Sequence, residues 1–244
     1  MTDARPTLIL LSGLLCDDRL WRGQALALAE RVRVVCPDLS RDDSLGAMAE
    51  RVLAAAPPRF SLGGQSMGGY LALEIYRRAP ERVERLALVC SNAHADAEAQ
   101  RQRRLDAIGL ARAGRFGQVV AAQAAVLFSP AAQDDPALAA LFRAMAEAVG
   151  PEGFARQQQA IMGRSDSIPT LATIACPTLV LGGGLDRLTP PELQQAIAAA
   201  IPGAVLEIVA DAGHLAPIER PEAVAAALGR WLDRPAAARS GVGA

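Results

Sequence analysis

The Gly-Gln-Ser-Met-Gly sequence at residues 64–68 constrains the fold of this chain more than any other segment. The apolar run before it, from Phe60, predicts a strand, and the residues after it, as far as Ala79, favour a helix. A serine in a turn between a strand and a helix has a strained backbone, so small residues are needed on both sides. Its hydroxyl stands at the helix N-terminus, where the dipole favours negative charge. We therefore predict that Ser66 is a nucleophile.

A serine hydroxyl is a weak nucleophile until a base takes its proton, and the chain has two histidines, His94 and His214. His214 lies in an Asp-Ala-Gly-His loop between an apolar strand and a helix, from which a side chain reaches across the ends of parallel strands. His94 also follows an apolar strand but has no glycine turn, and we interpret it as a loop residue. His214 is the predicted base.

The base needs a carboxylate to orient it. Asp186 follows a buried apolar strand and a Gly-Gly-Gly loop, and a helix is expected to begin near Pro190, with Thr189 as its N-cap. An aspartate in such a loop is also a common turn residue. Asp186 is the predicted acid, and Asp96, which follows an earlier strand, is the alternative.

On these motifs the chain resembles the α/β-hydrolase superfamily from about Thr7 to Asp233. The resemblance rests on Gly-Gln-Ser-Met-Gly-Gly from residue 64, Gly-Gly-Gly-Leu-Asp-Arg-Leu-Thr-Pro from residue 182, and Gly-His-Leu-Ala-Pro-Ile-Glu-Arg-Pro-Glu from residue 213. The chain order serine, aspartate, histidine is also the order of this family. Within it, the chain is similar to small cap-bearing carboxylesterases of the pimeloyl-carrier-protein methyl ester esterase type. The resemblance implies catalysis by a serine.

The family commonly has His-Gly after its first strand, and here Ser12 stands in place of that histidine. The resemblance implies that the backbone amides of Leu14 and Met67 hold the negatively charged oxygen of the reacting carbonyl. A main-chain donor does not depend on the missing histidine. The predicted substrate contacts are Leu15, Leu188 and Leu215.

Short apolar runs alternate with helical patterns, which predicts an α/β fold with a mostly parallel, doubly wound sheet of about six strands. The expected strands are residues 7–11, 32–36, 60–64, 85–90, 178–182 and 205–209, and the expected core helices are 44–55, 66–79, 191–200 and 221–231. Residues 94–175 break the alternation and predict a helical cap inserted between core segments 1–93 and 176–233. Residues 234–244 are expected to be a disordered tail.

The cap should contain several helices, with breaks at Gly114, Ser129-Pro130, Gly150-Pro151 and Gly163. It holds eight arginines and eight acidic residues, so its charges balance. Its bulky residues are expected to form mainly cap core, with a minority lining a largely apolar pocket: Phe116, Phe128, Phe142, Phe154, Met145 and Met162. The cluster Arg101, Arg103 and Arg104 is interpreted as a solvated helix face, the alternative being contact with an acidic acyl carrier protein.

Composition limits the classes of function. A formal net charge of −1 gives no reason to expect nucleic-acid or membrane partners, and all 25 cationic residues are arginine, which excludes lysine-based chemistry. No signal peptide or membrane span is predicted, so we expect a cytoplasmic protein. We expect no metal or cofactor. The four cysteines lack the spacing of a metal site and should be buried thiols: Cys16, Cys36, Cys90 and Cys176.

These features together predict a serine hydrolase that cleaves small, largely apolar carboxylic esters through an acyl-enzyme. Thioesterases, carbon–carbon bond hydrolases and cofactor-free perhydrolases use the same triad, so the residues leave these alternatives open. A ligand receptor that keeps a slow triad as a binding device is an alternative from another class.

Overall fold

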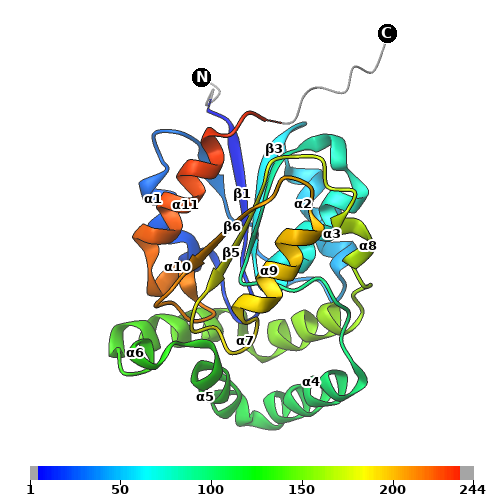
Figure 1. The fold of residues 1–244 in the computed structure, drawn as a ribbon. Helices are drawn as coiled ribbons and strands as arrows, with labels where there is room; N and C mark the ends of the chain where they lie inside the picture. The colour runs from blue at the N-terminus through cyan, green and yellow to red at the C-terminus, as the bar shows by residue number, and fades with distance from the viewer. Residues whose placement is uncertain (1–4, 237–244) are drawn as a thin grey trace.

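A six-stranded parallel sheet forms the centre of the molecule (Figure 1). The computed structural model describes residues 5–236, and residues 237–244 of the predicted tail lie outside that range. The strand order is β2-β1-β3-β4-β5-β6, which confirms the predicted α/β fold. The strands are β1 (Thr7–Leu11), β2 (Arg33–Val35), β3 (Phe60–Gln65), β4 (Val83–Val89), β5 (Thr178–Gly183) and β6 (Val205–Val209).

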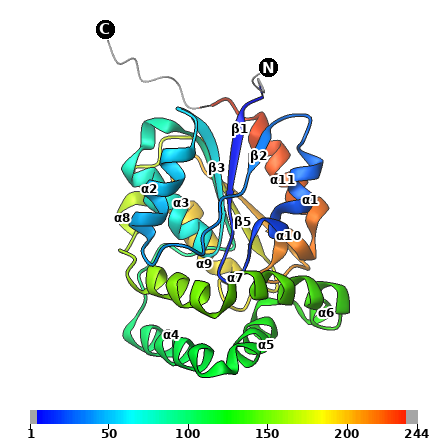
Figure 2. The same ribbon diagram turned by 180° about the vertical axis from the view of Figure 1, so that it is seen from behind.

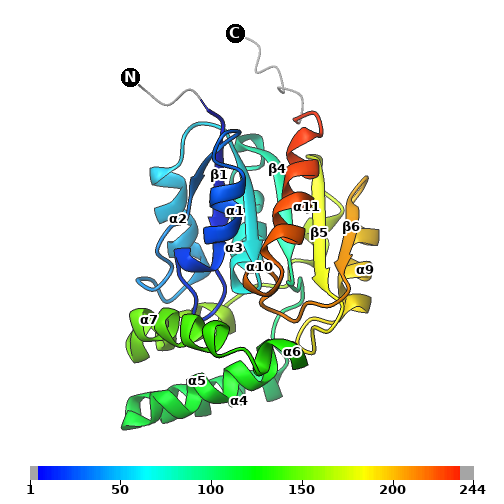
Figure 3. The same cartoon turned by 90° about the vertical axis from the view of Figure 1, so that its left-hand side faces the viewer.

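Helices cover both faces of the sheet because its central strands are apolar on both sides (Figure 3). In β1, Leu8 and Leu10 pack toward one face, whereas Ile9 and Leu11 pack toward the other. The first face carries α1 (Arg22–Ala27) and α11 (Pro221–Asp233). The second face carries α2 (Leu45–Ala55), α3 (Met67–Arg78) and α9 (Pro191–Ala200).

Several short helices connect these elements and were not expected from the sequence. They are η1 (Asp18–Trp21), η2 (Pro80–Arg82), α8 (Ile168–Leu171) and α10 (Ala216–Glu219). With α1, each has six residues or fewer, so less than two turns of hydrophobic periodicity are present to detect. In residues 5–236, no helix combines the length and the apolar character that crossing a membrane requires.

A helical insertion between β4 and β5 lies across the end of the sheet where the strands terminate (Figure 2). It consists of α4 (Glu98–Leu110), η3 (Ala111–Arg115), α5 (Phe116–Leu127), α6 (Pro130–Gln133) and α7 (Pro136–Met162). The predicted breaks are confirmed. Gly114 and Gly150 have φ of 76° and 68° inside the helical path, Ser129 caps the N-terminus of α6, and Gly163 ends α7.

Candidate active site

Ser66 lies in the turn between β3 and α3 with φ 53° and ψ −115°, a strained conformation for a residue other than glycine. Its amide donates to the Val89 carbonyl at 3.0 Å, and the Ser91 hydroxyl donates to the Ser66 carbonyl at 3.0 Å. These bonds, from the end of β4 and the segment that follows it, hold the turn. The Ser66 residue is only 8% exposed, so its hydroxyl faces an enclosed space.

The glycines on either side of Ser66 allow backbones to approach more closely than any side chain permits. A Cβ at Gly64 would lie 2.1 Å from the Gly68 carbonyl oxygen, and a Cβ at Gly68 would lie 2.1 Å from the Leu11 carbonyl oxygen. Both obstacles are backbone atoms of the sheet or of the turn itself. The Gly-x-Ser-x-Gly pattern is therefore a steric requirement of this turn.

His214 and Asp186 form a buried pair at the ends of the last two strands. Nδ1 of His214 lies 2.8 Å from Oδ2 of Asp186, and the two residues are 1% and 3% exposed. Burial by itself raises the pKa of Asp186, but the adjacent imidazole and hydrogen bonds from His214 and Thr189 outweigh it, so the pKa lies below its ordinary value. Asp186 is thus held as a carboxylate against the imidazole.

Thr189 supports this carboxylate, a role that the sequence did not reveal. Its hydroxyl donates to Oδ2 of Asp186 at 2.6 Å and lies 3.3 Å from Nδ1 of His214. The backbone amides of Leu188 and Thr189 donate to Oδ1 at 2.8 and 2.9 Å. The prediction that Thr189 caps α9 is wrong, because Pro190 occupies the N-cap position and the threonine side chain points to Asp186.

The loop that carries His214 is fastened to both the turn and the insertion. Nε2 of Gln65 donates to the His214 carbonyl at 2.9 Å, and the His214 amide donates to the Leu127 carbonyl at 2.8 Å. The buried Glu219 carboxylate accepts hydrogen bonds from the amides of Gly213 and Ser129. Among the described residues, Nε2 of His214 has no hydrogen-bond partner, so it is free to accept a proton.

The loop after β1 provides one wall of the site. Leu14 lines the same cavity as Ser66 and His214, and Met67 is the first residue of α3, so its amide has no intrahelical acceptor. The hydroxyl of Ser12 donates to the Asp17 carbonyl at 2.7 Å and closes this loop.

Leu15 was expected to contact substrate, and the structure corrects this. Its residue is 0% exposed, it has φ 64°, and it does not line the cavity. Its amide instead donates at 3.0 Å to Oε1 of Gln157 in α7. The Leu15 amide therefore ties the loop to the insertion, and the Leu15 side chain lies in the core.

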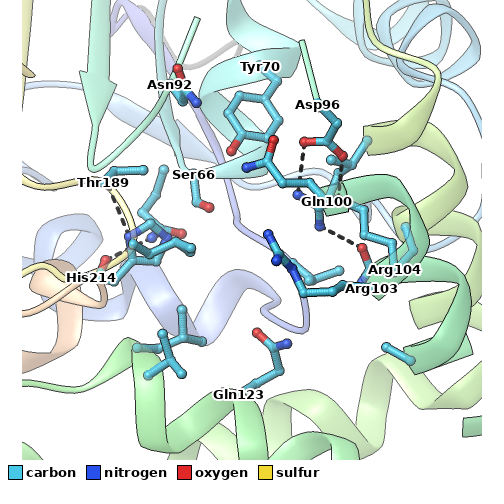
Figure 4. Close-up of a pocket in the computed structure, with 18 of the residues that line it drawn as sticks. Ser66, Tyr70, Asn92, Asp96, Gln100, Arg103, Arg104, Gln123, Thr189 and His214 are labelled. Atoms are coloured by element: carbon cyan, nitrogen blue, oxygen red, sulfur yellow. Dashed lines mark hydrogen bonds and ion pairs between the residues drawn. The ribbon is translucent and has the colours of Figure 1, made fainter. Parts of the chain in front are cut away.

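A cavity of about 330 Å³ lies between the insertion and the strand ends (Figure 4). Leu188 and Leu215, the other predicted substrate contacts, line it beside Ser66 and His214. The prediction that phenylalanines of the insertion contribute to its wall is wrong. Their rings pack against each other, in the pairs Phe116–Phe154 and Phe128–Phe142 with centroids 5.9 Å apart, and none lines the cavity.

Polar and charged side chains take the place of the expected phenylalanines. Asp96 has a fully buried side chain, and its carboxylate contacts Arg104 at 2.6 Å and Arg164 at 2.8 Å. Burial acts to raise the pKa of Asp96, but the two guanidinium groups hold it below its ordinary value. Asp96, the alternative acid, therefore pairs with arginines of the insertion, whereas Asp186 contacts His214.

His94 lies in a loop, as interpreted from the sequence, and it does not line the cavity. Its side chain is 58% exposed and lies 3.5 Å from Asp166. Asp166 accepts hydrogen bonds from the amides of Ala95 and Ile168 and so joins the two ends of the insertion. In the part of the chain that the structure describes, no group of three or more His, Cys, Asp or Glu side chains is placed to hold a metal ion.

A family model described as "Alpha/beta hydrolase family" matches residues 8–227. A pimeloyl-[acyl-carrier protein] methyl ester esterase of Nitrosomonas europaea is 38% identical over 94 residues, which are 35% of this chain and 37% of that enzyme. A thermophilic esterase of Thermogutta terrifontis, in a structure with malate bound, is 30% identical with a TM-score of 0.87, covering 93% of this chain and 89% of that chain. The enol-lactonase of Burkholderia xenovorans LB400 is 25% identical with a TM-score of 0.83, covering 94% and 92%.

Proposed function

Because the chain belongs to the alpha/beta hydrolase family, we propose that it hydrolyses small carboxylic esters with Ser66 as nucleophile, His214 as base and Asp186 as acid. One observation carries the proposal. The buried imidazole that Asp186 holds at 2.8 Å and the strained serine of the β3–α3 turn line the same cavity. Nucleophile, base and orienting group are the three roles that acyl transfer by a serine requires.

In the proposed reaction, Nε2 of His214 takes the proton as the Ser66 oxygen attacks the ester carbonyl. The leaving alcohol receives that proton, and an acyl-enzyme remains. A water molecule then attacks the acyl group and gives a proton to His214, which passes it to the Ser66 oxygen as the carboxylic acid leaves. Asp186 holds the imidazole in one tautomer and stabilises the imidazolium that forms in each half-reaction.

The amides of Leu14 and Met67 are the proposed donors to the carbonyl oxygen as it becomes negative. The Met67 amide opens α3, so the positive end of the helix dipole adds to the stabilisation. Loss of one such donor costs about 3 kcal/mol in other serine hydrolases.

Hydrolysis of p-nitrophenyl acetate and butyrate tests the proposal. Ser66→Ala and His214→Ala should each lower kcat by about 10⁴-fold or more with an unchanged circular dichroism spectrum. His94→Ala is the matched control, since it removes the other histidine, which lies outside the cavity. Equal activity of the Ser66→Ala variant and the native chain would refute the proposal.

The same assay separates the alternatives that share the triad. Matched substrates with an alcohol, a thiol or a carbon leaving group distinguish an esterase from a thioesterase and a carbon–carbon bond hydrolase. Peroxide-dependent formation of peracid identifies a perhydrolase. Ligand binding with no turnover of any of these substrates would identify a receptor instead.

A further inference from the structure

The cavity wall beside Ser66 has an excess of positive charge. Arg103, Arg104 and Arg164 line the cavity, and Asp96 is the carboxylate in its lining. Three guanidinium groups against one carboxylate leave a surplus of two positive charges. Asp186 does not line the cavity, because it lies behind His214. A cavity with such a surplus of positive charge favours an anionic ligand over a neutral one.

Arg103 differs from the other two arginines in having no protein partner. Within residues 5–236, it makes no hydrogen bond or ion pair, whereas Arg104 and Arg164 both contact Asp96. Figure 4 shows the Arg103 side chain extending from α4 into the cavity, between Gln100 and Gln123. Arg103 is an exposed residue, and its unpaired guanidinium keeps all of its N–H donors available for an anion in the cavity.

The paired arginines hold α4 in position next to Arg103. Besides contacting Asp96, Arg104 donates to Oε1 of Gln158 in α7 at 2.7 Å. The Arg164 guanidinium lies 4.3 Å from the centre of the Tyr70 ring in α3. These contacts join the insertion to the core, so the backbone that carries Arg103 is ordered before a ligand enters. A preordered donor loses less entropy on binding.

We infer, resting on the proposed ester hydrolysis, that the substrate carries a carboxylate and that Arg103 binds it within the cavity that contains Ser66. Arginine binds a carboxylate with two parallel hydrogen bonds. This contact would position the ester in the cavity and strengthen its binding. The side-chain amides of Gln100 and Gln123 flank Arg103 and are further donors. A half-ester of a short dicarboxylic acid is the simplest substrate of this kind, in contrast to the largely apolar ester that the sequence predicted.

Pairs of esters of equal length test this inference. Monomethyl glutarate is compared with methyl pentanoate, and monomethyl adipate with methyl hexanoate. The native protein should favour the charged ester of each pair, and the preference should fall as ionic strength rises. Arg103→Gln should lower the ratio of kcat/KM for charged over neutral ester by about 10- to 100-fold, mainly through KM, since it removes a charge-assisted hydrogen bond. Arg103→Glu should invert the preference.

Arg143→Gln is the matched control, because it removes an exposed arginine of α7 that does not line the cavity. It should leave the ratio unchanged. If Arg103→Gln leaves the ratio unchanged while Ser66→Ala abolishes turnover of both esters, the inference is wrong and the proposed function stands. If neither ester is cleaved, the proposed function fails.

Binding to the Ser66→Ala variant tests the anion site without turnover. Calorimetric titration with glutarate should give binding that the added Arg103→Gln substitution weakens at least 10-fold. Binding of inorganic phosphate without binding of glutarate would overturn the assignment of the group as a carboxylate. Absence of binding by both anions would overturn the site itself.

Discussion

Replacement of Gly68 by alanine should disrupt the turn that presents Ser66. The new Cβ would lie 2.1 Å from the carbonyl oxygen of Leu11 and 2.5 Å from its carbonyl carbon, against an ordinary contact of about 3.5 Å. Both atoms belong to the backbone of β1, which pairs with β3 on one side, so neither withdraws without breaking the sheet. We expect a loss of at least about 3 kcal/mol in the free energy of unfolding.

Thermal unfolding followed by circular dichroism measures this loss. For a chain of this size, 3 kcal/mol corresponds to a fall in Tm of about 6–12 °C, and ester turnover should fall with it because the Ser66 turn shifts. Gly109→Ala is the control, since its Cβ would have no neighbour within 4 Å and it lies in α4. That substitution should raise Tm slightly, by about 1–4 °C. A Tm and a kcat for Gly68→Ala equal to those of the native protein would refute the steric argument.

Three further predictions concern the buried carboxylates. Asp186→Asn should lower kcat for a neutral ester by about 10³- to 10⁴-fold, whereas Asp96→Asn should mainly lower the free energy of unfolding, by about 3 kcal/mol. The opposite ranking of their kcat values would identify Asp96 as the acid. The folded protein holds the pKa values of both carboxyls below their ordinary values. Their contribution to the free energy of unfolding is therefore complete above about pH 5, and it is lost as the pH falls through the pKa values of the folded state. Urea denaturation from pH 6 to pH 3 should therefore show a smaller loss of stability for Asp96→Asn than for the native protein, and equal losses would contradict the ion pairing. Thr189→Val removes a buried donor to Asp186 and should lower stability by about 1.5–3 kcal/mol, measured by the same denaturation; no change would contradict that hydrogen bond.

The elements that the sequence predicts well are those with local causes. The turn at Ser66 was predictable because the steric demands on Gly64 and Gly68 come from the turn itself and from the adjacent strand. The helix breaks at Gly114 and Gly150 were predictable because glycine adopts a positive φ at little cost. Each of these signals lies within a few residues of the structure that it determines.

The cavity wall was predicted poorly because contacts distant in the chain determine it. Arg103 and Arg104 are adjacent in sequence, but successive helical residues point about 100° apart. Both line the cavity, but Arg104 pairs with Asp96 and Gln158, whereas Arg103 has no partner among residues 5–236. A pattern of arginines on one helix does not reveal which residue meets such a partner. The phenylalanines of the insertion likewise pack with each other, a pairing that hydrophobicity alone leaves open.

Covalent labelling tests most directly whether Ser66 is the nucleophile, because a fluorophosphonate forms an analogue of the acyl-enzyme. The protein is incubated with a fluorophosphonate, its intact mass is measured, and the adduct is located by peptide mapping. We expect one adduct per chain, on Ser66, formed far more slowly in His214→Ala and absent in Ser66→Ala. An adduct on another residue, or equal labelling of the Ser66→Ala variant, would contradict the assignment of Ser66 as the nucleophile.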